Sequence, residues 1–257
     1  MNKEIVLLIH GFGSNNRVWD AYKELFLENN FCVVVPNLRH HGPGDSLVGF
    51  EKVGLIDYVD DLETLIKSFG LQPIIVGYSM GGLLALKLME RGYGKLGVCL
   101  APAAPRGINA ISLSVLRLFF RNLLVWRFWK KVHKPRFSSA RFGALGHLPI
   151  SEAWEIFELT SSAESGRVGV EIGFPIFDRR RASSLDETKI KCPVLVIGAQ
   201  RDTVTPIGIA RGVARMIADV SDYIEYPKFG HWLMSGQEFD EVSSDCLKWI
   251  ARKLDKR

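Results

Sequence analysis

The stretch that decides the fold is Pro73-Ile-Ile-Val-Gly-Tyr-Ser79-Met-Gly-Gly82, followed directly by the apolar, helically periodic segment Leu83–Glu90. This order predicts a buried strand, a sharp turn and a helix. A serine on such a turn has a strained backbone that only small neighbours tolerate, and glycine stands two residues before and two residues after Ser79. The turn exposes the serine Oγ at a helix N-terminus, which favours developing negative charge. Ser79 is therefore a candidate nucleophile; the alternative is a glycine-rich turn with an incidental serine.

Short apolar runs alternate with helically periodic segments on both sides of this stretch. The alternation predicts parallel strands joined by crossover helices, and strands that are apolar on both faces predict helices on both sides of the sheet. We therefore expect an α/β fold with a mostly parallel sheet of about six strands. The expected strands are Glu4–His10, Phe31–Pro36, Pro73–Tyr78, Gly97–Ala101, Pro193–Ala199 and Tyr223–Tyr226, and the expected helices are Val18–Asn29, Leu55–Phe69, Met80–Arg91, Ile207–Ile217 and Glu238–Lys253.

Residues 103–187 interrupt this alternation between the fourth and the fifth expected strand. The segment is helix-rich in pattern and contains Trp126, Trp129 and Trp154. It is too long for a loop between a strand and a helix, and such segments are usually functional or carry structure of their own. We interpret it as an insertion into a core formed by residues 1–102 and 188–257.

The excess positive charge of the chain lies in this insertion. The whole chain carries 33 Lys and Arg against 28 Asp and Glu, and residues 103–187 hold 13 of the former and 8 of the latter. No acidic residue lies between Glu90 and Glu152, an interval that contains the amphipathic run LRLFFRNLLVWRFWKKVHKPR. Two interpretations stay open. Leu116–Lys134 is an interfacial helix that attracts anionic lipid or an acidic substrate, or a lid helix whose cations form a solvated face.

Composition excludes several classes of protein. Of the 257 residues, 47% are hydrophobic and 24% are charged, which is typical of a folded globular domain. No motif indicates nucleic-acid binding. No secretion signal is recognised at the N-terminus, so we expect a cytoplasmic protein. The four cysteines are scattered and predict neither a disulfide framework nor a zinc site, so no metal is expected; they are Cys32, Cys99, Cys192 and Cys246. The most apolar long stretch is interrupted by Arg117, Arg121 and Arg127, so no membrane-spanning helix is expected.

A serine hydroxyl needs a general base, and the base needs a carboxylate that orients it. His231 follows the expected strand Tyr223–Tyr226, and Asp202 follows Pro193–Ala199. Both residues are therefore expected at the carboxyl ends of the strands, where the binding and catalytic sites of open α/β sheets lie. The chain order Ser79, Asp202, His231 fits a nucleophile elbow. The alternative interpretation of Asp202 is an Asx turn or a helix cap.

The other candidates for base and acid fit these roles less well. His147 lies inside the insertion and precedes any suitable acid, while His133 belongs to the basic run and is expected to be solvated. His10 is expected to brace its loop by hydrogen bonding. The remaining candidates lie in a turn or ahead of strands; they are His40, His41, Asp186 and Asp222.

Acyl transfer also needs two N–H donors aimed at the oxyanion. Met80, which follows the nucleophile, is expected to supply one. The loop His10-Gly11-Phe12-Gly13-Ser14 is expected to supply the other, from the backbone of Phe12. Gly11-Phe12-Gly13 lacks the third glycine of a dinucleotide fingerprint, so no nucleotide cofactor is expected.

These motifs together resemble the α/β-hydrolase superfamily over essentially the whole chain. The segment His10–Gly13 resembles its oxyanion loop and Gly77–Gly81 its nucleophile elbow, while Asp202 and His231 match the acid and base after its last two strands. The turn at 37–46 resembles the family pattern D-x-R-G-x-G-x-S but starts with Asn37 and carries His40 in place of a glycine. The resemblance implies a helical cap (lid) at 103–187. The chain departs from the family at its start, because it enters the strand before the oxyanion loop within a few residues, so we expect a core without the family's first two strands.

The resemblance implies a serine hydrolase without a cofactor, because the dehalogenase and epoxide-hydrolase branches carry aspartate where this chain has Ser79. The chain is most similar to carboxylesterases and monoacylglycerol lipases, which implies a small-molecule ester or lipid substrate. The apolar cap predicts a medium or long acyl group. The side chains expected to line its pocket are Phe12, Tyr78, Trp126, Trp129 and Trp232.

Other functions fit the same residues. Hydrolysis of a carbon–carbon bond in a diketone, thioester hydrolysis and perhydrolysis would all use the same nucleophile. A ligand-binding module with little turnover is a further alternative, since fold does not fix function. Peripheral contact of the basic cap with an anionic membrane is compatible with each of these, and the oligomeric state stays open.

Overall fold

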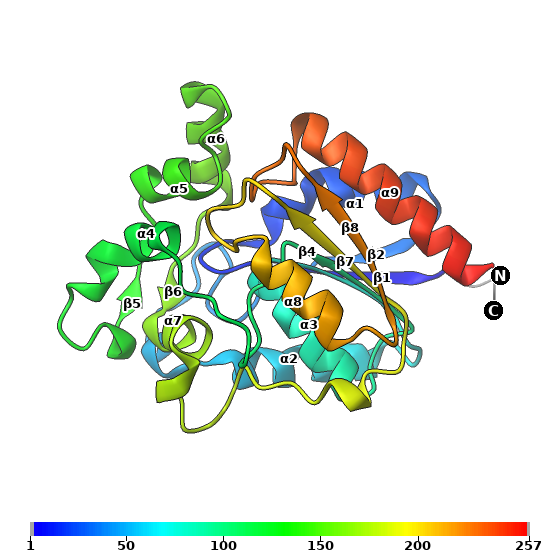
Figure 1. The fold of residues 1–257 in the computed structure, drawn as a ribbon, viewed down its shortest axis with the longest axis horizontal. Helices are drawn as coiled ribbons and strands as arrows, with labels where there is room; N and C mark the ends of the chain where they lie inside the picture. The colour runs from blue at the N-terminus through cyan, green and yellow to red at the C-terminus, as the bar shows by residue number, and fades with distance from the viewer. Residues whose placement is uncertain (1–2, 256–257) are drawn as a thin grey trace.

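The computed structural model describes residues 3–255 and contains a six-stranded parallel sheet with the strand order β2-β1-β3-β4-β7-β8 (Figure 1). Every neighbouring pair in this sheet is parallel, as the alternating sequence pattern predicted. The strands are β1 (Ile5–Ile9), β2 (Cys32–Val34), β3 (Ile74–Tyr78), β4 (Leu96–Leu100), β7 (Val194–Ala199) and β8 (Ser221–Tyr226). The α/β fold class and the parallel sheet of six strands are thereby confirmed.

Two apolar layers cover the sheet from opposite sides. Leu7 and Val196 pack into one layer with α2, α3 and α8, whereas their neighbours Leu8 and Ile197 pack into the other with α1 and α9. This follows from the strand period of two, and it explains why β3, β4 and β7 are buried at every position. The helices are α1 (Asp20–Glu28), α2 (Leu55–Ser68), α3 (Met80–Glu90), α8 (Gly208–Met216) and α9 (Gly236–Leu254).

The segment between β4 and β7 forms a separate layer, at the side toward which the arrows of β7 and β8 point in Figure 1. It is mainly helical, and it also contains a two-stranded antiparallel ribbon that the sequence pattern did not indicate. We call this segment, residues 103–187, the cap segment. Its elements are α4 (Leu113–Leu123), β5 (Val132–His133), α5 (Phe137–Gly143), α6 (Ile150–Thr160), β6 (Glu164–Ser165) and α7 (Gly166–Gly173).

The prediction of one interfacial helix over Leu116–Lys134 is wrong. Helix α4 ends at Leu123, and Arg127 adopts a left-handed backbone with a φ of 56°. A short 3₁₀ turn at Phe128–Lys130 follows, and the chain then enters β5. Pairing of β5 with β6 overrides the helical periodicity of the sequence, because it satisfies backbone groups that a longer helix would use. Within residues 3–255, no helix has the length and apolarity needed to cross a bilayer.

Candidate active site

Ser79 lies on the predicted sharp turn, between the end of β3 and the start of α3. Its φ of 57° and ψ of −121° are strained for a residue with a side chain. A Cβ on Gly77 would lie 2.1 Å from the carbonyl oxygen of Gly81, and a Cβ on Gly81 would lie 2.0 Å from that of Ile9. Glycine is therefore required on both sides of Ser79, because the turn brings three backbone segments into contact.

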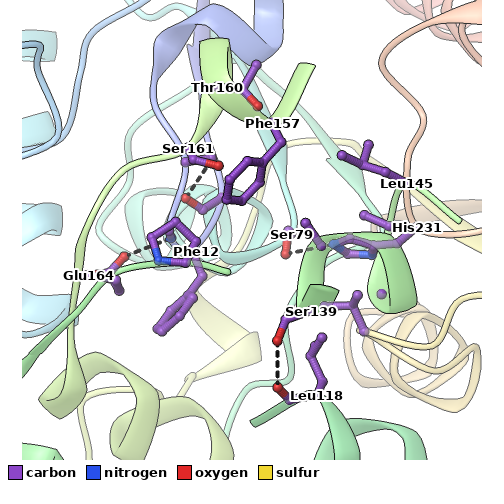
Figure 2. A pocket seen from close by; sticks show the side chains of 18 of the residues that line it. Phe12, Ser79, Leu118, Ser139, Leu145, Phe157, Thr160, Ser161, Glu164 and His231 are labelled. Atoms are coloured by element: carbon purple, nitrogen blue, oxygen red, sulfur yellow. Dashed lines mark hydrogen bonds between the residues drawn. The ribbon is translucent and has the colours of Figure 1, made fainter. Parts of the chain in front are cut away.

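A chain of hydrogen bonds joins Ser79, His231 and Asp202, which come from three separate strand ends. His231 Nε2 lies 3.1 Å from Ser79 Oγ (Figure 2), and His231 Nδ1 lies 2.7 Å from Asp202 Oδ2. All three residues are buried. Because the carboxylate accepts from Nδ1–H, Nε2 is left to accept the serine proton. The geometry thus fits a nucleophile, its base and an orienting acid.

Asp202 also closes the turn in which it lies, so the two interpretations drawn from the sequence describe the same residue. Its Oδ1 accepts from the backbone N–H groups of Val204 and Thr205, at 2.8 and 2.7 Å. The hydroxyl of Thr205 lies 2.8 Å from Asp202 Oδ2. These contacts fix the carboxylate plane while leaving Oδ2 directed at His231.

Tyr78 holds the loop that carries the imidazole. Its hydroxyl donates to the carbonyl oxygen of His231 at 3.0 Å, and the two rings lie 5.0 Å apart between centroids. Burial raises the pKa of Tyr78, so the phenol stays protonated and donates. Tyr78 thus lines the site and also holds the backbone of His231 in place.

Two side chains hold the peptide group that joins Gly11 to Phe12 in the loop after β1. The carbonyl oxygen of Gly11 accepts from His10 Nδ1 at 3.0 Å and from Ser14 Oγ at 2.9 Å. In a planar trans peptide the C=O and N–H point in opposite directions, so holding the Gly11 carbonyl also orients the Phe12 N–H. Met80 is the first residue of α3, and its N–H has no acceptor within the helix.

His10 braces this loop as predicted. Leu38 N–H donates to His10 Nε2 at 3.1 Å, which leaves the proton on Nδ1 to reach the Gly11 carbonyl. Burial and the nearby charge of His41 lower the pKa of His10 to about 3. His10 is therefore a neutral donor to the loop and not a proton-transfer group.

Two cavities meet at Ser79. The first has a volume of about 200 Å³ and is lined by Tyr78, Leu145, Phe157, His231 and Trp232, several of which are labelled in Figure 2. The second, of about 110 Å³, is more apolar and runs between α4, α7 and α8 past Met80, Val115, Phe174 and Ile209. Side chains that line both cavities are Phe12, Ser79, Phe119, Asn122, His133 and Val204.

Three of the five side chains expected to line the pocket do so, and two do not. Phe12, Tyr78 and Trp232 line the first cavity, whereas Trp126 and Trp129 line neither cavity and are 82% and 44% exposed. The prediction for these two tryptophans is wrong, because α4 ends before them and the chain turns outward. His133, expected to be solvated, is half-buried and lines both cavities.

The inner face of α4 supplies side chains that sequence reasoning missed. Val115, Phe119 and Asn122 recur at three- and four-residue spacing and face the cavities. The signal that identifies them is the helical periodicity of the sequence at 113–123. The described part of the chain holds no cluster of three or more His, Cys, Asp or Glu side chains that could bind a metal ion.

Comparison with known proteins gives a consistent assignment. A sequence model of the alpha/beta hydrolase family matches residues 6–244. The chain is 27% identical to a pimeloyl-[acyl-carrier protein] methyl ester esterase of Chromobacterium violaceum, over 95% of this chain and 94% of that protein. It is 24% identical to a bifunctional esterase/perhydrolase of Acinetobacter calcoaceticus, over 96% and 91% of the two chains. A solved monoacylglycerol lipase of Paleococcus ferrophilus superposes with a TM-score of 0.73 at 18% identity, covering 98% of this chain and 97% of the lipase.

Proposed function

Since this chain belongs to the alpha/beta hydrolase family, we propose that it is a serine hydrolase that cleaves carboxylic esters through an acyl-enzyme on Ser79. The observation that carries the proposal is the hydrogen-bonded series Ser79–His231–Asp202 beside an apolar cavity. The relatives support it, because two of them bear the names of an ester esterase and an esterase/perhydrolase.

The proposed reaction has two halves, and protein groups alone carry both. Ser79 Oγ attacks the ester carbonyl carbon while His231 Nε2 takes the hydroxyl proton. The Phe12 and Met80 N–H groups stabilise the oxyanion of the tetrahedral intermediate. The intermediate collapses, and His231 returns the proton to the departing alcohol. Water then attacks the acyl-enzyme with His231 again as base, which releases the acid and restores Ser79.

We propose that the acyl group is of medium or long chain length and lies in the second cavity. The walls of this cavity are aliphatic and aromatic, and apolar walls contribute affinity in proportion to the area they cover. The first cavity has more polar groups, among them Ser14, Thr160 and Ser161, and suits the alcohol portion. The relative named as a methyl ester esterase makes methyl esters of long acids a useful addition to the substrate panel.

Chain-length preference tests this assignment. In a p-nitrophenyl ester series from acetate to palmitate, Val115→Trp is expected to lower kcat/KM for the best long ester by about tenfold or more, with acetate changed by less than about twofold. The added indole would fill space beside α4 that a long chain needs. Leu113→Trp is the matched control, since Leu113 lies on the same helix but is 88% exposed. An equal loss for acetate and for the long ester would contradict the assignment.

Perhydrolysis is a second candidate for the same acyl-enzyme, because one relative is named as an esterase/perhydrolase. Hydrogen peroxide would replace water in the second half-reaction and release a peracid. Thioesters and diketones are tested in the same way, with Ser79 as common nucleophile. A protein that neither cleaves any of these nor reacts with a fluorophosphonate probe would instead be a binding module.

We further propose that α4 docks on an anionic lipid surface, from which the substrate enters the cavities. The exposed side chains Leu113, Leu116, Phe120 and Leu124 follow one another at three- and four-residue spacing along its outer face. The lysines and arginines at 117–136 form no ion pair with any residue of the described chain. An exposed apolar stripe beside unneutralised cations is typical of an interfacial helix.

Vesicle sedimentation tests this docking. Arg117→Gln with Arg121→Gln is expected to lower partitioning onto phosphatidylserine-containing vesicles at low salt by about tenfold or more, since each cation near the surface contributes about 1 kcal/mol. The control is Lys23→Gln with Lys228→Gln, which removes the same charge from exposed positions outside the cap segment. If the wild-type protein does not partition onto these vesicles at low salt, the docking proposal is wrong. The basic face would then be only solvated or would bind an acidic protein.

A further inference from the structure

The loop that bears the Phe12 N–H is fastened to the cap segment where α6 ends. Asn15 N–H donates to the Thr160 carbonyl at 2.9 Å, and Ser162 N–H donates to the Gly13 carbonyl at 3.0 Å. Gly13 N–H in turn donates to Glu164 Oε2 at 3.3 Å, a contact drawn in Figure 2. Backbone and carboxylate bonds together thus join two segments about 150 residues apart in the sequence.

Glu164 is a buried carboxylate surrounded by donors. Its side chain is 1% exposed, and besides Gly13 it contacts Ser165 N–H at 2.9 Å, Tyr58 Oη at 2.7 Å and His41 Nε2 at 3.1 Å. Burial and the adjacent Glu164 charge raise the pKa of Tyr58, so its phenol donates. Four donors on one carboxyl group match the ionised form, which accepts hydrogen bonds only.

His41 supplies the opposite charge. Its Nδ1 lies 3.0 Å from the Arg39 carbonyl oxygen and its Nε2 lies 3.1 Å from Glu164 Oε2, so both ring nitrogens face acceptors. A neutral imidazole has one N–H, and two acceptors therefore match the imidazolium. Burial lowers the pKa of His41, but the charge and hydrogen bond of Glu164 outweigh it, and the pKa is raised. The other titratable groups that face the His41 ring are Tyr58 and neutral His10. His40 lies on the ring of Phe50, which also packs against His41.

We propose that Glu164, paired with His41, is a positioning residue for the oxyanion hole. His10 and Ser14 hold the peptide before Phe12, and Glu164 holds the peptide after it, by way of Gly13 N–H. With both flanking peptides fixed, the backbone dihedral angles of Phe12 are fixed as well. Its N–H is then aimed before the reaction starts, which is what makes an oxyanion donor effective. The inference rests on the proposed acyl transfer at Ser79.

The test compares two buried carboxylates of the cap segment in the intact protein. Glu164→Gln keeps the size of the side chain but removes the charge and puts an amide N–H among donors. With p-nitrophenyl acetate, kcat is expected to fall by about 10- to 100-fold while KM changes by less than about threefold. The matched control is Glu171→Gln. Glu171 is equally buried and accepts from Leu55 N–H and Arg167, so it also joins cap to core, but it does not contact the loop.

The control separates positioning from mere attachment of the cap segment. Glu171→Gln is expected to keep kcat within about twofold, whatever its effect on the melting temperature. Equal losses of kcat in both variants, or a folded Glu164→Gln enzyme with wild-type kcat, would overturn the inference while leaving ester hydrolysis standing. A wild-type protein that neither hydrolyses esters nor labels with fluorophosphonate would overturn both proposals together.

A pH profile gives a second readout and a second variant. The raised pKa of His41 means that its pairing is fully present below the unfolded value of about 6.5 and is lost as the pH rises through the folded value. The kcat of the wild type is therefore expected to decline on the alkaline side. His41→Asn is expected to have a lower kcat than the wild type below that folded value and no such decline, so that the two profiles converge at alkaline pH. Superimposable wild-type and His41→Asn profiles would overturn the role assigned to the pair.

Discussion

Alanine at position 79 is expected to abolish ester hydrolysis, with kcat lower by about 10⁴- to 10⁶-fold. The substitution removes the Oγ that lies 3.1 Å from His231 Nε2, and with it the hydroxyl that this nitrogen would deprotonate. Alanine keeps the Cβ that serine already carries at this strained φ, so the turn gains no new clash. Fluorophosphonate labelling, located by mass spectrometry, should occur at Ser79 in the wild type and vanish in the variant.

Ser139→Ala is the matched control for this loss. Ser139 lines the first cavity, and its hydroxyl donates to the Leu118 carbonyl at 3.5 Å. We expect its kcat to stay within about threefold of the wild type, because no proton transfer passes through it. Residual turnover or labelling of Ser79→Ala near the wild-type level would show that another group is the nucleophile, and the acyl-enzyme proposal would then be wrong.

The sequence predicts the core of the site because its constraints are local. The prediction of Ser79 as nucleophile rests on a strand, two glycines and a helix in direct succession, and the structure requires glycine where positions 77 and 81 meet backbone atoms. The prediction of Asp202 and His231 as acid and base rests on their positions after predicted strands, since parallel strands bring their carboxyl ends to one edge of the sheet. Neither step required knowledge of how side chains pack.

The cap segment was harder to predict because packing over long sequence distances decides it. The prediction of Trp126 and Trp129 as pocket residues rests on residue type alone, whereas a left-handed residue and a two-residue strand set the course of the chain there. Glu164 and His41, which form a pair, lie 123 residues apart in the sequence, and no local sequence pattern predicts this contact. Only the inner face of α4 could have been assigned, from its periodicity.

Asparagine at position 202 is expected to lower kcat by about 10⁴-fold with little change in fold. Oδ1 of Asp202 accepts from the N–H groups of Val204 and Thr205, so the amide nitrogen of asparagine cannot occupy that position. The amide N–H must therefore face His231 Nδ1, which then has to accept. The ring proton moves to Nε2, where it faces Ser79 Oγ, and the imidazole can no longer take the serine proton.

Asp222→Asn provides the control, because Asp222 is one of the two alternative acids considered from the sequence and lies in β8. Its carboxylate accepts from Trp249 Nε1 at 2.6 Å and pairs with Lys253, far from His231 in the hydrogen-bond network. We expect this variant to hydrolyse p-nitrophenyl esters within about twofold of the wild type. The opposite pattern, in which Asp202→Asn stays active and Asp222→Asn does not, would remove Asp202 from the mechanism. The hydrogen-bond geometry argues against that outcome. Replacing one carboxylate oxygen at position 202 by an amide nitrogen reverses the direction of two hydrogen bonds, the one between residue 202 and His231 Nδ1 and the one between His231 Nε2 and Ser79 Oγ.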